Sequence, residues 1–288
     1  MLLSSLTRRA IARVTQINEI RQVNGRKLDS ARVAYITPES LLFYFGNIHS
    51  QRGQDGILAE IFRRLGIVAG MFVEFGAWDG VYLSNCRYLA ERGWGGLFIE
   101  GDSAKYRKLS AVYRHSPDVK TLNAMVGTQS LPGSRLGVLL DQAGIAPSKV
   151  TFLSIDIDGP DLEIFEDMEF APPVVLIEGG FKFTPSLVRA IPVEVARRNT
   201  QQPLAVIVDT AQKRGYRAVC FYQDTYLVRE DLAASFMRVD ARALYADAFN
   251  FMPNGFRRGL LNLRNRSTLI RKYEREGLGR FEVDPLAY

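Results

Sequence analysis

The chain has 288 residues, of which 47% are hydrophobic and 24% charged, a composition that excludes a mostly disordered protein. No apolar run approaches the ~20 residues that a membrane-spanning helix needs, and two cysteines, Cys86 and Cys220, are too few for a disulfide framework. The net charge of +6 allows an anionic partner, but a global charge specifies neither fold nor chemistry.

Length and composition favour one large α/β domain with terminal extensions. We expect a helical or partly ordered N-terminal extension over residues 1–49, a catalytic domain over 50–232 and a basic helical extension over 233–288. The chain opens with MLLSSLTRRAIARVTQ, where arginines follow a very short apolar stretch, the reverse of a secretory signal. Together with the low cysteine content, this predicts a cytoplasmic protein.

The first clear element is a helix over 57–65, with Leu58, Ile61 and Leu65 on one face. The segment SQRGQDG, residues 50–56, precedes it directly. Asp55 in this segment can cap the helix, and capping alone would explain an acid at that position.

The stretch 71–102 predicts a strand, a glycine-bearing turn, a helix and a second strand. An apolar run, 71–73, meets Glu74 and the turn, and the helix extends to Gly93. Its apolar positions recur at helical spacing; they are Leu83, Cys86, Leu89 and Ala90. The second apolar run, 97–99, ends on Glu100, so both strands end on acids.

Ligands of open α/β sheets bind at the carboxyl ends of the strands, where turns without bulky side chains let the backbone approach. Gly76 and Gly80 supply that room. Glu100, about 20 residues beyond the turn, is suited to accept hydrogen bonds from the two hydroxyls of a ribose. With Glu74 and Asp79 the turn is acidic, and it should repel phosphate and favour a cation.

Strands and helices then alternate, which predicts a parallel sheet. We expect helices over 103–113 and 134–143, and strands over 119–126, 150–157 and 172–177. A helix over 204–214 and two strands, 216–222 and 225–228, should close the sheet in antiparallel fashion. The polar segment 181–202 could build a substrate lid.

Asp156 and Asp158 close a buried strand at alternate positions, just before Gly159. Two carboxylates at such a short distance repel each other, so they need a metal, a cationic ligand, a proton or hydrogen-bond donors beside them. Helix N-terminal charge explains Asp161 and Glu163 in the following turn, but it does not explain Asp156.

Glu178 ends the next strand and should face the same rim. A third carboxylate there would complete an oxygen-ligand set for Mg²⁺ from Asp156, Asp158 and Glu178. The alternative is that Glu178 pairs with a basic residue such as Lys182.

The tail 256–277 is strongly basic. A basic helix could rest on an anionic membrane, at the inner face, or bind an acidic carrier lipid. The alternative is a solvated amphipathic helix packed through its apolar residues. No zinc-finger or RNA-binding motif supports specific nucleic-acid recognition.

At these motifs the chain resembles the FkbM-like family of class I S-adenosylmethionine-dependent methyltransferases. The first motif of that family is an acid, one residue, Gly, Ala, two residues and Gly, which residues 74–80 fit, and its second is an acid-x-acid-Gly motif, which residues 156–159 fit. The resemblance implies a Rossmann-like three-layer α/β sandwich, with a mostly parallel seven-stranded sheet and an antiparallel last strand. It implies cofactor contacts from Glu74, Gly76, Ala77, Asp79, Gly80, Glu100, Asn123 and Asp156.

The resemblance also implies that Asn123 faces the adenine ring, and that Gln54 and Asp55 line the pocket. Asp156 or Asp158 would act as base or metal ligand, because a similar acidic pair in the macrocin O-methyltransferase type binds magnesium beside the sugar hydroxyl. His49, just before the SQRGQDG segment, is a further candidate base.

We therefore expect an S-adenosylmethionine-dependent O-methyltransferase whose acceptor is a sugar hydroxyl of a glycan, glycolipid or glycosylated natural product. The competing class is a non-catalytic scaffold or adaptor on the same fold, which would have no need for acids at three strand ends. A nucleotide-sugar or NAD enzyme is disfavoured by the acidic turn. The sequence identifies neither the acceptor nor the metal requirement, and it leaves open a homo-oligomer.

Overall fold

The computed structural model describes residues 39–130, 133–179, 183, 188, 190–191 and 201–251. The N-terminal segment 1–38, most of the expected lid and the basic tail 256–277 lie outside the described residues.

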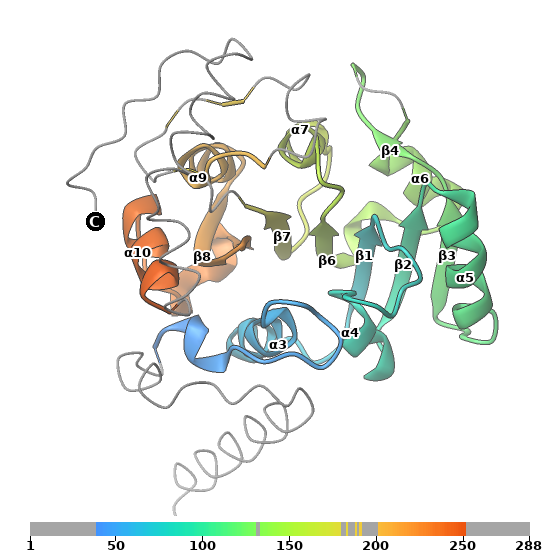
Figure 1. Ribbon diagram of the computed structural model, residues 1–288, viewed down its shortest axis with the longest axis horizontal. Coiled ribbons are helices and arrows are strands. Elements are labelled where there is room, and N and C mark those ends of the chain that lie inside the picture. The colour runs from blue at the N-terminus through green and yellow to red at the C-terminus, as the bar shows by residue number, and fades with distance from the viewer. Residues whose placement is uncertain are drawn as a thin grey trace, which may run out of the picture.

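A seven-stranded sheet organises the fold, with the strand order β3-β2-β1-β6-β7-β9-β8 (Figure 1). The neighbouring pairs are parallel except those of β9, which runs antiparallel to both β7 and β8. The strands are β1 (Met71–Phe75), β2 (Gly95–Glu100), β3 (Val119–Asn123), β6 (Val150–Ile155), β7 (Val174–Glu178), β8 (Tyr216–Tyr222) and β9 (Asp224–Arg229).

Helices cover both faces of this sheet, so that the fold has three layers. In Figure 1, α7 (Asp161–Asp167) and α9 (Leu204–Lys213) lie on one side, and α3 (Gln54–Leu65) and α4 (Arg87–Glu91) on the other. The remaining helices are α5 (Ser103–Tyr113), α6 (Leu136–Gln142), α10 (Ala241–Phe251) and the short 3₁₀ turns η1 (Leu41–Tyr44), η2 (Pro147–Lys149) and η3 (Glu230–Ser235). The predicted Rossmann-like three-layer sandwich, with a mostly parallel seven-stranded sheet and an antiparallel last strand, is confirmed.

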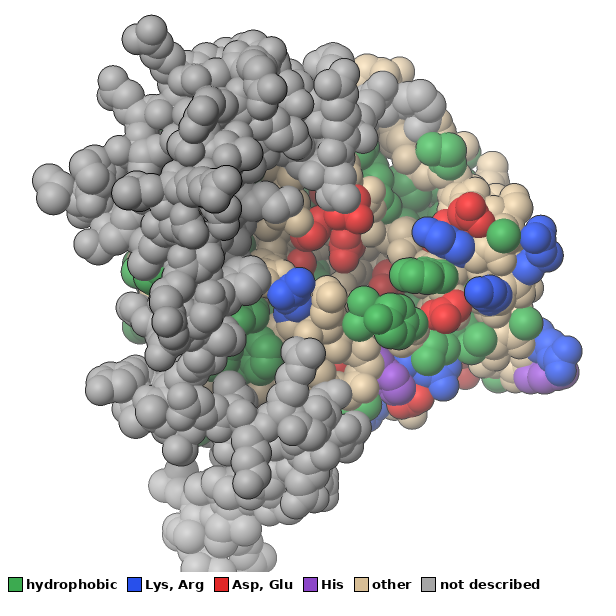
Figure 2. Space-filling view, viewed as in Figure 1, with side chains coloured by type: hydrophobic (Ala, Val, Ile, Leu, Met, Phe, Trp, Pro, Cys, Tyr) green, Lys and Arg blue, Asp and Glu red, His purple; other side chains and the backbone are tan. Residues whose placement is uncertain are grey.

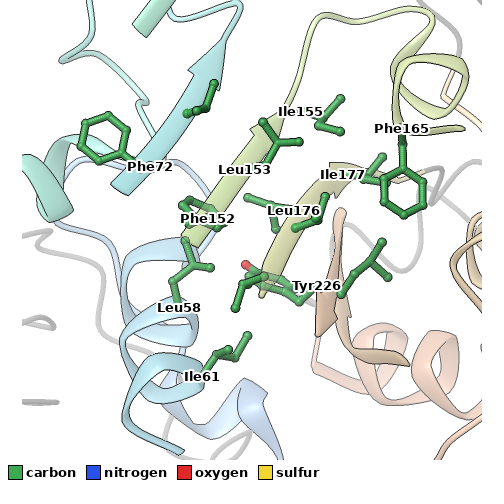
Figure 3. Packing of buried hydrophobic residues seen from close by; sticks show 14 of the residues in the cluster. Leu58, Ile61, Phe72, Phe152, Leu153, Ile155, Phe165, Leu176, Ile177 and Tyr226 are labelled. Carbon is green, nitrogen blue, oxygen red and sulfur yellow. The ribbon is translucent and has the colours of Figure 1, made fainter. Parts of the chain in front are cut away.

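The core lies between the sheet and its helices (Figure 3). Leu58 and Ile61 of α3 pack against one face, near Phe152 of β6, and Phe165 of α7 packs on the other. These four side chains are at most 1% exposed. Burying an aliphatic or aromatic side chain of this size contributes roughly 1.5 to 3 kcal/mol relative to leaving it in water.

The packed unit extends beyond residues 50 and 232. Leu41 and Leu42 of η1 and Leu244 and Tyr245 of α10 belong to the same apolar cluster as the sheet. The flanking residues that the structure describes are therefore part of the domain. No described helix is both long enough and apolar enough to cross a membrane.

Two predicted elements were wrong. The helix over 83–90 is only Arg87–Glu91, because Leu83 has a positive φ of 60° and the next three residues are held in a turn by Glu74. The strand over 119–126 ends at Asn123. Val126–Gly127 (β4) pairs instead with Ser134–Arg135 (β5) in a separate two-stranded sheet.

We expect Phe152→Ala to destabilise the fold by about 3 to 5 kcal/mol, because this fully buried ring would leave a cavity beneath the sheet. The free energy of unfolding in urea measures the loss. Val138→Ala, at a residue that is 50% exposed on α6, is the control and should change stability by less than about 0.5 kcal/mol. Equal effects of the two substitutions would contradict this packing.

Candidate functional site

A cavity of about 760 Å³ opens at the carboxyl edge of the parallel strands. On the face shown in Figure 2, acidic side chains gather in a hollow beside apolar and basic ones. The lining residues used below are Gln54, Glu74, Gly76, Ala77, Trp78, Tyr82, Leu83, Asn85, Glu100, Lys105, Asp156, Asp158 and Glu178. A volume of this order is typical of small-molecule and cofactor sites.

Glu74 at the end of β1 holds the loop that forms one wall of the cavity. Its Oε2 accepts hydrogen bonds from Ser84 Oγ at 2.7 Å and from the Cys86 N–H at 3.0 Å, and its Oε1 accepts from the Asn85 N–H at 3.1 Å. Burial raises the pKa of this carboxyl, and the hydrogen bonds only partly oppose that shift. Glu74 thus shapes the cavity by fixing residues 84–86.

Glu100 ends β2 and joins two loops at the cavity. Its Oε2 accepts from the Trp78 N–H at 2.8 Å, and its Oε1 accepts from the Asp102 N–H at 2.7 Å. A carboxylate has about four lone-pair directions. Each oxygen can therefore accept one further hydrogen bond from a ligand hydroxyl while its backbone contact is kept.

The two glycines of the predicted first motif have different roles. A Cβ on Gly76 (φ +72°) would lie 2.3 Å from the carbonyl oxygen of Asp156, so this glycine lets the loops after β1 and β6 approach each other. A Cβ on Gly80 would lie 2.6 Å from side-chain atoms of Leu109 and Tyr113. Gly80 packs against α5 and is not part of the cavity lining.

Ala77 and Asp79, two further residues of the first motif, also differ in their positions relative to the cavity. Ala77 is 3% exposed and lines the cavity. Asp79 instead closes the turn, because its Oδ1 accepts from the Val81 and Tyr82 N–H groups at 3.0 and 2.8 Å. Asp79 does not line the cavity.

Asp156, Asp158 and Glu178 come together as predicted from the strand ends. One carboxylate oxygen from each lies within 4.8 Å of those of the other two. Protein atoms crowd Asp156 although its carboxylate faces the cavity. This loss of water, together with the charges of Asp224, Asp161 and Asp158, raises its pKa well above the ordinary value.

Burial and the charge of Asp156 likewise raise the pKa of Glu178, to about 9. Its Oε1 accepts from the Gln201 side-chain amide. Lys182, the alternative partner considered from the sequence, lies outside the described residues.

Asp224 is a fourth carboxylate at this edge that the sequence analysis missed. It is 4% exposed and stands opposite Glu178 in the antiparallel ladder. Gln54 Nε2 donates to its Oδ2 at 2.6 Å, and burial raises the pKa of Asp224 to about 7. The signal was available, because the first residue of an antiparallel strand lies at the edge where parallel neighbours end.

Strained backbone concentrates at the cavity. The described non-glycine residues with positive φ are Trp78, Leu83, Asp158 and Gln223, and the first three of them line the cavity. Such conformations cost of the order of 1 to 3 kcal/mol each and gather at functional sites. Trp78 and Leu83 are not acidic, so the backbone strain points to this cavity by a second route.

Two further predicted site residues, Asn123 and Asp55, lie outside the cavity lining. Asn123 bridges the ends of β2 and β3, since its Nδ2 donates to the Glu100 carbonyl at 2.7 Å. Asp55 does not cap α3, which begins one residue earlier after Gly53. Its Oδ2 accepts from the N–H groups of Ile48, His49 and Ser50 at 2.6 to 2.9 Å, so it fixes the preceding loop.

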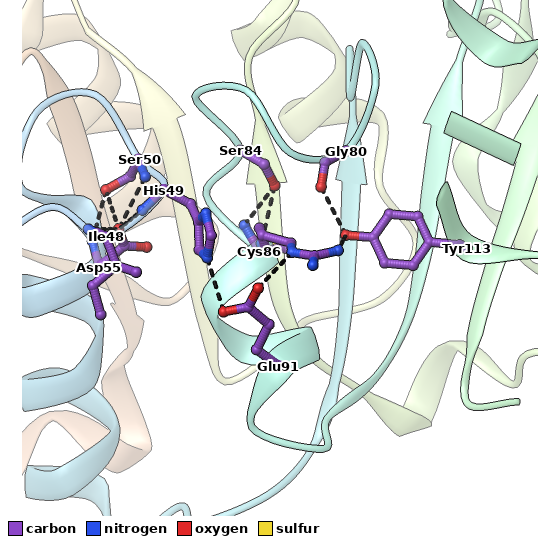
Figure 4. A network of polar contacts seen from close by, with 10 residues as sticks. Ile48, His49, Ser50, Asp55, Gly80, Ser84, Cys86, Glu91 and Tyr113 are labelled. Atoms are coloured by element: carbon purple, nitrogen blue, oxygen red, sulfur yellow. Dashed lines mark hydrogen bonds and ion pairs between the residues drawn. The ribbon is translucent and has the colours of Figure 1, made fainter. Parts of the chain in front are cut away.

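His49 also lies outside the cavity lining, in a polar network on the neighbouring surface (Figure 4). Its Nε2 contacts Glu91 Oε2 at 2.8 Å, and Arg87 links Glu91 to the hydroxyl of Tyr113. That hydroxyl donates to the carbonyl of Gly80 at 2.7 Å. The network ties the loop before α3 to α4, α5 and the first-motif loop.

Comparison with family models gives no match, and no curated protein matches the sequence. Among solved structures, monomeric WbdD matches 70% of this chain at 12% identity with a TM-score of 0.41, and this chain spans 48% of that chain. A putative caffeoyl-CoA O-methyltransferase from Staphylococcus aureus matches 77% of this chain and 98% of its own at 13% identity, with a TM-score of 0.38. A SAM-dependent methyltransferase from Thiobacillus denitrificans in complex with S-adenosyl-L-homocysteine matches 91% of this chain and 92% of its own at 14% identity, with a TM-score of 0.30. Likenesses this distant carry no argument about activity, which has to come from the site.

The raised pKa of Asp224 predicts a pH-dependent stability. The folded chain keeps a proton up to about pH 7 that the unfolded chain loses near its ordinary value of 3.8, so stability should fall as pH rises between the two. For one such proton the loss is roughly 2 to 3 kcal/mol between about pH 5 and pH 7.

Urea unfolding of metal-free protein across this range measures the effect. Asp224→Asn, which keeps an acceptor for Gln54, should flatten the decline, and Asp118→Asn at an exposed position should not. An unchanged slope in Asp224→Asn would contradict the assignment.

Proposed function

We propose that the chain is an S-adenosylmethionine-dependent O-methyltransferase of the FkbM-like type. The observation that carries the proposal is that Glu100 and the Asp156–Asp158–Glu178 group line one cavity at the carboxyl edge of the sheet. A carboxylate suited to ribose hydroxyls and carboxylates suited to a reacting hydroxyl then share a single pocket.

The cavity fits the proposed cofactor. Glu100 retains capacity for the ribose hydroxyls, and Gly76 and Ala77 leave space beside the backbone. The acidic wall that includes Glu74 suits the positive sulfonium and ammonium groups. When bound, the cofactor supplies the methyl group.

The carboxylate group also fits Mg²⁺. Asp156, Asp158 and Glu178 offer three oxygens of the type this ion prefers, and magnesium usually takes one or two carboxylates and keeps several waters. One oxygen of Glu178, Oε2, is shielded from solvent and has no hydrogen-bond partner among the described residues. A bound cation would relieve the repulsion in this group.

Methyl transfer to oxygen is an in-line displacement, so the protein has to align the two reactants and accept the hydroxyl proton. Glu74 and Glu100 maintain the loops that would hold the cofactor. Asp156, whose pKa is raised, is the residue we assign as the base. Asp158, in its left-handed conformation, would orient the acceptor hydroxyl or share a metal.

We further propose a sugar hydroxyl of a glycan, glycolipid or glycosylated natural product as acceptor. The exposed rings of Trp78 and Tyr82, which lie edge to face at 5.6 Å between centroids beside the cavity, offer an apolar rim for such a ring. A cytoplasmic location, with peripheral contact of the basic tail with anionic lipid, also remains a proposal.

A non-catalytic scaffold on this fold is the alternative. Strained residues and repelling carboxylates around a cavity cost stability, and a scaffold would gain nothing from them. A measurement of cofactor binding distinguishes the two functions, because only the methyltransferase needs to bind the cofactor.

We expect calorimetry to detect micromolar binding of S-adenosylhomocysteine by the wild-type chain. Glu100→Ala should weaken this binding about 10- to 100-fold, since hydrogen bonds to a charged group contribute about 1.5 to 3 kcal/mol. Glu169→Ala, which removes a mostly exposed carboxylate, is the control. Absence of binding by the wild type would favour the scaffold.

Asp156→Asn tests the chemical step, with an acceptor found by transfer of a labelled methyl group from the cofactor. We expect kcat to fall about 10²- to 10⁴-fold, the usual contribution of a general base. Affinity for S-adenosylhomocysteine should change by less than about threefold. Full activity in this variant would exclude Asp156 as the base.

A further inference from the structure

The acidic edge of the cavity has neutral partners where ion pairs would be expected. In the part of the chain that the structure describes, no Lys, Arg or His forms an ion pair with Asp156, Asp158 or Glu178, nor with Asp224. Arg52 acts on Asp224 through its charge without forming an ion pair with it. Other acids of this chain do have such partners; Glu60 lies against both Arg63 and Arg64. We call this group of four carboxylates the acidic cluster. It shares the lack of an ion pair with Asp55, Glu74 and Glu100, but its members lie beside one another at the sheet edge.

Two members of the acidic cluster face each other directly. Glu178 and Asp224 are partners in the antiparallel ladder between β7 and β9. Like charges directly opposite on such a pair destabilise it. The pairing therefore needs protons, a cation or well-placed donors.

Glutamine amides provide the donors. Gln54 Nε2 donates to Asp224 Oδ2 at 2.6 Å, and Gln201 Nε2 donates to Glu178 Oε1. Gln54 is itself held, because its Oε1 accepts from the Arg52 N–H at 2.5 Å. The two amides approach from different elements, the start of α3 and the segment before α9.

An amide and a cationic side chain have opposite consequences for the acidic cluster. Both can orient a carboxylate by donating a hydrogen bond, but only Lys or Arg would neutralise it. With amides, the positive charge that balances the acidic cluster has to come from protons or from a bound cation. Oε2 of Glu178 is shielded from solvent and has no hydrogen-bond partner among the described residues. The same is true of Asp55 Oδ1 and Glu163 Oε2, but of these three side chains Glu178 alone lines the cavity.

We propose that Gln54 and Gln201, here called the amide clamp, are positioning residues that hold Asp224 and Glu178 with neutral donors, so that a divalent cation and not a basic side chain can balance the acidic cluster. This inference rests on the proposed function, since the cation is the one suggested for the methyl-transfer site. In this proposal Asp224, on the neighbouring strand β9, supports Glu178 and is not itself a ligand of the cation.

The test uses Mn²⁺ as the probe, with the full-length chain and the loss of the free-ion electron paramagnetic resonance signal as the readout. Gln201→Lys introduces an ammonium against Glu178 and should weaken Mn²⁺ binding at least about tenfold. Gln212→Lys adds the same charge at an exposed position of α9 and should leave the affinity unchanged within about twofold.

Gln201→Met separates positioning from charge, because it keeps the size of the side chain and removes the donor. We expect about 3- to 10-fold weaker Mn²⁺ binding, together with a lower Tm of the metal-free protein. Gln201→Lys should instead raise the metal-free Tm, since it relieves repulsion. A merely structural glutamine would lower the Tm in both variants.

Wild-type Mn²⁺ affinity in Gln201→Lys would overturn the inference, and so would a wild-type chain that binds no Mn²⁺. If Gln201→Lys lacks the circular dichroism of the folded chain, Gln54→Lys takes its place, because Gln54 donates to Asp224. The same changes in Mn²⁺ affinity are then expected, and wild-type affinity in this variant would overturn the inference. Binding of S-adenosylhomocysteine tests the proposed function separately. Cofactor binding without metal binding would reject the amide clamp and keep the methyltransferase.

Discussion

The repulsion among carboxylates at one edge of the sheet is the constraint on which the rest of the site depends. Asp156, Asp158, Glu178 and Asp224 come from three neighbouring strands whose ends meet there. The loss of water around Asp156, Glu178 and Asp224 makes their negative charges costly. A chain selected for stability alone would place neutral or paired residues at these positions. The fold tolerates the acids because its large core lies between the sheet and the helices on both faces and does not depend on them.

A second set of acids has a different purpose, although the residue type is the same. Glu74 and Asp55 are buried carboxylates whose oxygens accept hydrogen bonds from backbone N–H groups of loops that surround the cavity. They convert loops that lack regular secondary structure into fixed walls. Glu100 has both functions, since it joins two loops and still lines the cavity. The number of donors around each carboxylate distinguishes a supporting acid from one that awaits a ligand.

Sequence patterns predicted much of this architecture. The alternation of apolar runs and helical stretches predicted the parallel sheet and its antiparallel last strand, and acids at strand ends predicted a cluster at one edge. The helix expected over 83–90 failed because Glu74, distant along the chain, offers residues 84–86 better hydrogen bonds than a helix would. Asp55 was expected as a helix cap because of its position in the sequence, yet it turns back to the preceding loop.

The sequence by itself determined which strands end on carboxylates, because strand ends follow from local apolar runs and from the turns that stop them. Only the tertiary structure decided which acids share a cavity and which are partners of backbone N–H groups. It also decided that Asp224 faces Glu178, and that Gln54 and Gln201 reach the acidic cluster from distant segments. Those relations depend on strand order and register, which arise from long-range packing and leave no periodic signal in a single chain.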